Sequence, residues 1–325
     1  MKVNQYDLNN NYIHSFNSYA ETARVFNCDE STIRKAVKFN KKVFGKFRFT
    51  VGETIDSDYT VNTPKNTPRI LFLDIETSPL LAFVYQKQVW KARIGHKQVV
   101  SDYFMLTWSA KFFGETEVHS DGCTGEEAYA ENDERIVKNL WLLMDEADII
   151  VAHNGDSFDI PNINARFVYW KLFPPSPYRQ IDTLRIAQKH FGFTHNSLDA
   201  LCDFFDVPGK IETNFELWKA CVRGEDAALI EMEVYNRQDV KSLESVFHKI
   251  KGYAKGLPNM DLYQDTEYSV CPCCGSETIK AMDGKYFYTQ AVKYQAYRCE
   301  SCGSISRSKT GIKFENKKLI SAIPR

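Results

Sequence analysis

The central part of the chain carries acidic residues where its predicted strands and helices begin or end. Residues 69–74 form an apolar run of strand length that ends in Asp74, and Glu76 follows two positions later. Because alternate side chains of a strand point to the same side, both carboxylates can face one ion if the strand continues. Asp159 follows the next clear buried strand, 148–152, where a helix is expected to begin. This order of strands and acids constrains the fold more than any other feature.

The remaining apolar periodicity predicts an α/β domain. Asp239 lies in the last long helix, one turn after Tyr235, so the two side chains share a helix face. A few strands come first and helices come later, with alternation between them, which is the order of an α/β fold. The expected strands are 69–74, 104–113, 115–120 and 148–152, with Gly114 as a turn, and the expected helices are 126–145, 160–170, 183–191, 197–205 and 226–250.

Taken one at a time, these acids have ordinary structural explanations. An acid at a strand end is often a turn residue, and Asp159 is well suited to cap a helix. A Tyr and an Asp at helical spacing are often a packed ring and a solvated acid. The joint pattern favours a functional interpretation, because all four acids occur in order and in the expected kinds of element.

Three segments of this domain resemble the exonuclease motifs of the DEDD superfamily of 3′–5′ exonucleases. They are Leu73–Thr77, Asn154–Asp159 and Tyr235–Asp239. The YxxxD form of the third motif is that of the tyrosine (DEDDy) branch, as in the proofreading domain of family B DNA polymerases, and Val234 stands where the histidine branch has His. The resemblance implies a ribonuclease H-like mixed sheet with helices. Too few residues follow Ile250 for polymerase palm and fingers, so it implies a free-standing exonuclease of phage or bacterial origin.

The resemblance also implies roles for the acids. Phosphodiester hydrolysis needs charge stabilisation at the attacking and leaving oxygens, which two divalent ions about 3.5–4 Å apart supply. Oxygen ligands suit Mg²⁺ or Mn²⁺. By resemblance, Asp74 bridges both catalytic ions, Glu76 and Asp239 complete one, and Asp159 holds the other through water. By resemblance, Tyr235 orients the attacking water. A phenol with a pKa of about 10 stays protonated at neutral pH, so it acts through a hydrogen bond and not as a base.

Further residues near the motifs are candidates for substrate contact. Thr77 and Asn154 are expected to contact the terminal nucleotide. Phe158 is a third candidate, with core packing as its alternative role. Asp182 is expected to cap the helix that follows it, with a role in the site as the alternative.

Five of the nine cysteines lie between residues 271 and 302, in two C-x-x-C-G segments. The Gly after each second Cys fits the tight turn of a zinc knuckle, so the segments predict one structural Zn²⁺ in a zinc ribbon over 265–325. A redox pair is disfavoured, because it needs a single C-x-x-C in a thioredoxin-like setting. The role of Cys273 stays open. The expected ligands are Cys271, Cys274, Cys299 and Cys302.

The first 50 residues carry the marks of a small DNA-binding module. Residues 18–24 and 31–36 are expected to form two short helices joined by a turn, with Arg34, Lys35 and Lys38 on the exposed side of the second. Residues 5–48 resemble the intron-encoded nuclease repeat (NUMOD type). The alternative is a basic helical pair used for protein contact. Residues 51–68, rich in Thr, Asn and Pro, are expected to link this module to the nuclease domain at 69–255.

Charge is divided along the chain in a way that the net charge of −1 conceals. Residues 1–50 hold 9 basic and 4 acidic residues, and residues 268–325 hold 10 and 4. Residues 51–267 hold 22 basic and 34 acidic residues. Basic modules suit a polyanion, and acids between them suit bound metal cations, although chance segregation of surface charge gives the same pattern.

These observations predict a metal-dependent 3′–5′ exonuclease acting on nucleic acid, with DNA favoured over RNA and single strands over duplex. The alternatives are an exoribonuclease, or a nucleic-acid-binding protein whose nuclease core is not its main activity. Without a signal-peptide pattern or a membrane span, we expect a cytoplasmic protein, in the bacterial host if phage-encoded, with no membrane partner. The sequence names no protein partner.

Overall fold

The computed structural model describes residues 3–6, 12–16, 18–26, 29–39, 48–51, 67–85, 93–209 and 211–313. By its contacts the chain divides into two units, Met1–Lys65 and Asn66–Arg325. Most of the expected linker lies outside the described residues, and its first residue, Val51, ends a strand. None of the helices in these ranges combines the length and apolar character needed to cross a membrane.

The N-terminal unit packs two helices on a small sheet. Helix α1 (Tyr19–Val25) begins at Ser18, whose Oγ accepts the Glu21 N–H at 3.1 Å, and α2 (Glu30–Phe39) follows. Both expected helices are therefore confirmed. The sheet was not predicted, because its strands are short and largely polar. It has the order β2-β1-β3, formed by β1 (Val3–Tyr6), β2 (Tyr12–Phe16) and β3 (Arg48–Val51), and its core contains Val3, Phe16, Ala23, Ile33, Ala36 and Phe49.

The second unit is built on a five-stranded mixed sheet of order β10-β9-β4-β7-β8. Strands β10, β9 and β4 are parallel, whereas β7 and β8 are antiparallel to their neighbours. The mixed α/β fold class is thus confirmed. Strand β4 lies in the centre and continues through the first motif. The strands are β4 (Ile70–Thr77), β7 (Met105–Phe112), β8 (His119–Gly122), β9 (Ile149–Ala152) and β10 (Arg179–Asp182).

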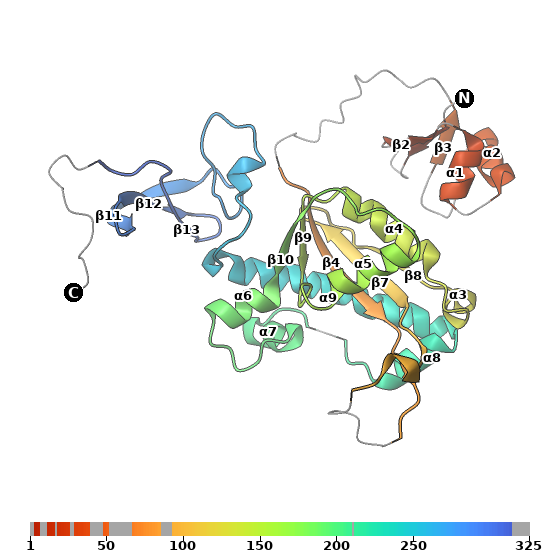
Figure 1. Ribbon diagram of the computed structural model, residues 1–325. Helices are drawn as coiled ribbons and strands as arrows, with labels where there is room; N and C mark the ends of the chain where they lie inside the picture. Colours follow the sequence, from red (N-terminus) through yellow and green to blue (C-terminus); the bar gives the residue numbers. More distant parts are fainter. Residues whose placement is uncertain are drawn as a thin grey trace. The chain divides into compact units, whose positions relative to one another are not determined.

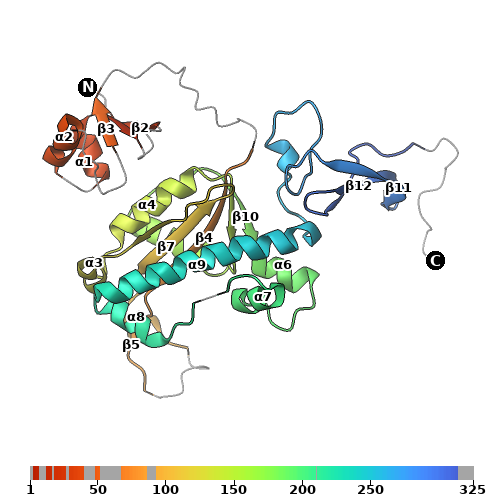
Figure 2. The same ribbon diagram turned by 180° about the vertical axis from the view of Figure 1, so that it is seen from behind.

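Helices cover both faces of this sheet, as the opposite views of Figures 1 and 2 show. Leu71, Leu73 and Ile75 of β4 pack in one core with α4 (Glu134–Asp145) and α5 (Asp159–Tyr169). Phe72 projects to the other side, where its ring meets Phe247 of α9 (Asp226–Ile250) with centroids 5.7 Å apart. Asp74 and Glu76 share the parity of Phe72, so they also face α9. The smaller helices are α6 (Thr183–His190), α7 (Leu198–Phe205) and α8 (Phe215–Val222).

Two expected boundaries are wrong. The helix expected over 126–145 is split into α3 (Gly125–Tyr129) and α4, because Glu131 adopts a left-handed φ of 55° between them. The strand expected over 115–120 is instead β8, which begins only at His119, after the turn at Gly114. Strand β10 and helix α8 were not predicted.

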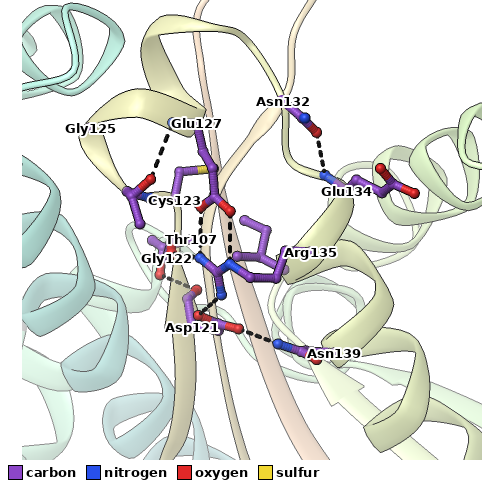
Figure 3. Close-up of polar contacts among 12 residues, drawn as sticks. Thr107, Asp121, Gly122, Cys123, Gly125, Glu127, Asn132, Glu134, Arg135 and Asn139 are labelled. Atoms are coloured by element: carbon purple, nitrogen blue, oxygen red, sulfur yellow. Dashed lines mark hydrogen bonds and ion pairs between the residues drawn. The ribbon is translucent and has the colours of Figure 1, made fainter. Parts of the chain in front are cut away.

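An arginine explains how the split helix is held against the sheet (Figure 3). Arg135 of α4 binds Glu127 of α3 through two nitrogens, at 2.8 and 2.7 Å, and its Nη1 lies 2.7 Å from Asp121 of β8. Asn139, one turn further along α4, donates to the other oxygen of Asp121 at 2.6 Å. The edge strand β8 is therefore tied to both helices.

A second ion pair is buried at the start of α4. The Asp133 carboxylate binds Arg166 of α5 through both oxygens, at 2.6 and 2.7 Å. It also accepts the Met105 N–H at 2.7 Å and the Trp170 indole N–H at 2.6 Å. Asp133 immediately precedes α4, so these bonds fix the start of that helix against α5 and β7.

Replacement of Arg166 by Met is expected to lower the free energy of unfolding by about 3–5 kcal/mol, because Asp133 is then buried without its counter-charge. Denaturant unfolding followed by tryptophan fluorescence measures the loss. The matched control is Arg223→Met, which removes an exposed pair with Glu225 and is expected to cost about 0–1 kcal/mol. Equal losses in the two variants would contradict the assignment.

Candidate active site

Three carboxylates of the first and third motifs meet where β4 passes under α9. Ligand oxygens of Asp74, Glu76 and Asp239 all lie within 4.8 Å of one another, a spacing that suits a shared cation. Strand β4 continues through Thr77, so Asp74 and Glu76 do lie on one face, as the two-residue spacing predicts. Asp239 is 2% exposed, and a cluster of acids this close is stabilised when a divalent ion offsets its charge.

Asp159 contacts the same strand where the pairing of β4 with β9 has ended. The pairing of β9 with β4 runs through Phe72, and beyond it Oδ1 of Asp159 accepts the Ile75 N–H at 3.2 Å. Asp159 is the first residue of α5, and burial raises the pKa of its carboxyl to about 7. Asp159 is therefore linked to the segment between Asp74 and Glu76, although it is not one of the three clustered acids. It is not the cap of α5, because Phe158 holds that position.

The turn between β9 and α5 is held in place by Asp182. Its carboxylate accepts the N–H groups of Asn154, at 3.0 Å, and Asp156, at 3.2 Å. It also caps α6 through the N–H of Leu184 at 2.9 Å, which confirms the capping role. Asn154 has a left-handed φ of 68°. Asp182 thus fixes the backbone of the second motif.

A cavity of about 390 Å³ opens at the end of β4. Thr77 lines it, as do Trp218 and Phe215 of the unpredicted helix α8. Asn154 and Phe158 do not line it; Phe158 is 38% exposed, so core packing is wrong for this ring. The full lining is Thr77, Ser78, Pro79, Thr213, Asn214, Phe215 and Trp218.

Tyr235 lies on the buried face of α9, one turn before Asp239. Its ring is 5% exposed and meets Trp218 edge-on, with centroids 6.0 Å apart. Because Trp218 also lines the cavity, the tyrosine is held between the cavity wall and the acid cluster. This contact fixes its ring through packing.

Asn236 is a site residue that the motif analysis did not single out. Its Nδ2 donates to Asp74 Oδ2 at 2.6 Å, and the residue is fully buried. Its Oδ1 accepts no hydrogen bond from the part of the chain that the structure describes. The signal in the sequence was its spacing: Asn236 precedes Asp239 by three residues, which places both on one helix face.

Asn236→Ala is expected to weaken binding of Mn²⁺ by about 10–100-fold, because Asp74 loses the donor that orients it. Titration of Mn²⁺ against the melting temperature measures this affinity, and melting in EDTA reports the cost to folding separately. Gln238→Ala, on the same helix, is the control; its side chain bonds Ser242 at 3.4 Å. A metal affinity equal to that of the control would refute the role of Asn236.

The four expected cysteines form a second cluster at the C-terminal sheet. Sulfur atoms of Cys271, Cys274, Cys299 and Cys302 lie within 4.8 Å of one another. The two knuckles repeat one hydrogen-bond pattern, in which the N–H of Gly275 bonds Cys271 O and that of Gly303 bonds Cys299 O. Both glycines have a φ of 74°. The sheet has the order β11-β12-β13, from β11 (Ile279–Tyr288), β12 (Lys293–Cys299) and β13 (Ile305–Arg307).

Cys273 is outside this cluster. Its thiol contacts the Lys251 carbonyl, just beyond α9, at 3.4 Å, and burial raises its pKa to about 12. Within the cluster, the hydrogen bond between Cys271 and Cys274 lowers the pKa of Cys271 and raises that of Cys274. Next to Lys251, Gly252 leaves no room for a side chain, since a Cβ there would lie 2.4 Å from the Cys302 carbonyl oxygen.

The basic residues expected to contact DNA lie on the exposed face of α2. Arg34, Lys35 and Lys38 are all exposed. Arg34 pairs with Glu30 through its Nε at 2.7 Å and stacks over the Tyr19 ring at 4.3 Å. Its charge is therefore partly neutralised within the module.

Comparison with known proteins defines the class of the two modules. Residues 1–37 match the model of the NUMOD1 domain, and residues 112–251 match that of the RNase_H superfamily. The chain thus carries a NUMOD1 module and a ribonuclease H-like domain. The second match begins after β4, so it includes Asp159, Tyr235 and Asp239 but not Asp74 or Glu76.

Two individual proteins resemble parts of the chain. DNA polymerase III PolC-type of Ureaplasma parvum is 30% identical over 104 residues, which are 32% of this chain and 7% of that protein. The family B DNA polymerase of the archaeon Pyrobaculum calidifontis aligns with a TM-score of 0.42 and 15% identity, over 69% of this chain and 32% of its own. The chain therefore spans only a small part of either polymerase.

Proposed function

We propose that the ribonuclease H-like domain is a metal-dependent 3′–5′ exonuclease that degrades single-stranded DNA. The proposal rests on one observation: Asp74, Glu76 and Asp239 converge within 4.8 Å beside a cavity. Their oxygens are the ligands that Mg²⁺ and Mn²⁺ prefer. The similarity to DNA polymerase III PolC-type supports DNA as the substrate.

Each residue of the site has a separate role in the proposed hydrolysis. Bound divalent ions supply Lewis-acid stabilisation of the attacking and leaving oxygens. Asp74, Glu76 and Asp239 would hold them, and Asp159 would hold the second ion through water. Tyr235, fixed by Trp218, orients the attacking water through its hydroxyl. The cavity beyond Thr77 receives the terminal nucleotide.

Asp74→Ala and Asp239→Asn are each expected to lower DNA hydrolysis by about 10³-fold or more, because charge stabilisation by the metal is lost. The assay follows 5′-labelled single strands with Mg²⁺, Mn²⁺ or EDTA, and circular dichroism verifies the fold. Near-normal activity in either variant would reject the assignment.

The same assay tests polarity and substrate. A descending ladder from the 5′ label indicates 3′–5′ digestion, whereas a single internal cut indicates an endonuclease. Parallel RNA of the same sequence distinguishes the proposed deoxyribonuclease from an exoribonuclease. Binding without cleavage of either substrate would favour the alternative of a nucleic-acid-binding protein.

We further propose that the four-cysteine cluster holds one structural Zn²⁺, since four thiolates and no acids suit this ion. Outside the cluster, Cys123, Cys202 and Cys221 are buried and form no disulfide, which fits a reducing compartment, and we propose the cytoplasm. We also propose that the NUMOD1 module holds DNA through Arg34, Lys35 and Lys38, whose exposed charges can contact phosphates.

Purified protein is expected to contain about one zinc per chain, and Cys302→Ser to lose most of it, because structural sites need all four ligands. Cys273→Ser is the matched control and is expected to keep its zinc. Elemental analysis by mass spectrometry measures both. Equal zinc in the two variants would overturn the ligand assignment.

A further inference from the structure

The segment directly after the first motif differs in charge from the domain around it. Its described parts, residues 77–85 and 93–101, contain the basic residues Arg93 and Lys97 and no acidic residue, whereas residues 51–267 as a whole contain 22 basic and 34 acidic residues. Ser78 and Pro79, at its start, line the cavity. An acid-free segment at the mouth of an acid cluster provides the local positive charge that a polyanionic strand needs in order to approach.

The described parts of this segment, 80–85 and 93–101, form what we call the aromatic hairpin. Its strands are β5 (Leu81–Ala82) and β6 (Val99–Ser101), which pair antiparallel. Next to them Phe83 and Gln98 exchange backbone and side-chain hydrogen bonds: the Phe83 N–H donates to Gln98 O at 2.9 Å, and Gln98 Nε2 donates to Phe83 O at 3.0 Å. The backbone of Phe83 is therefore fixed while its ring is not covered.

The apolar side chains of the aromatic hairpin face solvent. Phe83 is 76% exposed, Leu81 is 60% exposed, and the Tyr85 ring is fully exposed. Arg93 and Lys97 of the opposite arm are exposed as well. Rings and cations together are the combination by which proteins bind single strands without reading sequence: bases stack on rings, and cations contact phosphates.

The base of the aromatic hairpin continues directly from β4 and is closed by two hydrogen bonds between Ser78 and Phe104. The Ser78 N–H donates to Phe104 O at 2.9 Å, and the Phe104 N–H donates to Ser78 Oγ at 3.0 Å. Ser78 is two residues beyond Glu76. From Pro79, at the cavity, to Phe83 is four residues, an extended reach of at most about 14 Å. The rings thus lie within a few nucleotides of a strand end held at the metal site.

We propose that the aromatic hairpin is the binding platform for the single-stranded DNA upstream of the terminal nucleotide, with Phe83 and Tyr85 stacking on bases and Arg93 and Lys97 contacting phosphates. The inference rests on the proposed exonuclease function and adds to it the element that selects an unpaired strand. In a duplex the faces of the bases are stacked on one another, so the rings have no surface to bind.

The first test separates the platform from the metal site by using two substrates. The nitrophenyl ester of thymidine 5′-monophosphate needs the metal site and cavity alone, whereas a 20-nucleotide oligo-dT also reaches the hairpin. The Phe83→Ala/Tyr85→Ala double variant is expected to hydrolyse the ester within about twofold of the wild type. On oligo-dT its kcat/KM is expected to fall by about tenfold or more, chiefly through KM, because base stacking is lost.

Phe173→Ala is the matched control. Phe173 is 85% exposed but lies beyond the far end of α5, a helix of 11 residues or about 16 Å, from Asp159. The proposal is overturned if the double variant and this control degrade oligo-dT at the same rate. If the wild type cleaves neither substrate, the proposed function fails instead. Fluorescence anisotropy of oligo-dT binding in EDTA then still tests the hairpin, with tenfold weaker binding by the double variant as the supporting result.

The second test examines the cations. Arg93→Gln and Lys97→Gln are each expected to lower the slope of log K against log salt for oligo-dT binding by about 0.7, the value for one phosphate contact on a single strand. Unchanged slopes in both variants, together with full oligo-dT binding by the Phe83→Ala/Tyr85→Ala variant, would reject the proposal. The exposed hairpin would then be a candidate surface for contact with a protein.

Discussion

Repulsion among the carboxylates at the end of β4 is the constraint on which the rest of the structure depends. Asp74, Glu76 and Asp239 are brought within 4.8 Å of one another, and Asp159, at the start of α5, is buried against Ile75. Packing has to hold these groups together against their charge. Phe72 and Phe247 clamp α9 to β4 on one face, and the Asp133–Arg166 pair joins α4, α5 and β7 on the other. The acids are thus held at the end of a rigid sheet that is covered on both sides.

The sequence predicted the features that depend on residues close together in the chain and missed those that depend on residues far apart in it. Helix α9 was predicted to its terminal residues, since 25 residues of helical periodicity outweigh local preferences. Spacing on one strand predicted that Asp74 and Glu76 share a face, whereas the meeting of Asp239 with them was an implication of the motif resemblance. The break between α3 and α4 was missed, because the partner of Asp133 lies 33 residues away on α5.

The same reasoning explains what was missed at the site. Trp218 and Phe215 belong to α8, which is only eight residues long and was not predicted. Asn236 lies inside the third motif, but its bond to Asp74 joins residues 162 positions apart. The backbone N–H of Asn154 bonds Asp182, 28 residues further along the chain, which local spacing does not reveal; the nucleotide contacts expected at Asn154 and Phe158 stay predictions.

The close contact at Gly252 has a consequence for how such a chain can be assembled from parts. The residue lies two positions beyond the end of α9 and has no space for a side chain against Cys302, while the adjacent Lys251 carbonyl accepts a hydrogen bond from the Cys273 thiol. At the junction between the ribonuclease H-like domain and the cysteine module, the backbone at Gly252 therefore packs directly against the backbone at Cys302. Recombination that exchanges the cysteine module succeeds only if it carries residues 251–252 with it. A crossover placed within α9 preserves this contact, whereas one placed just after Gly252 pairs the knuckle with a foreign helix end.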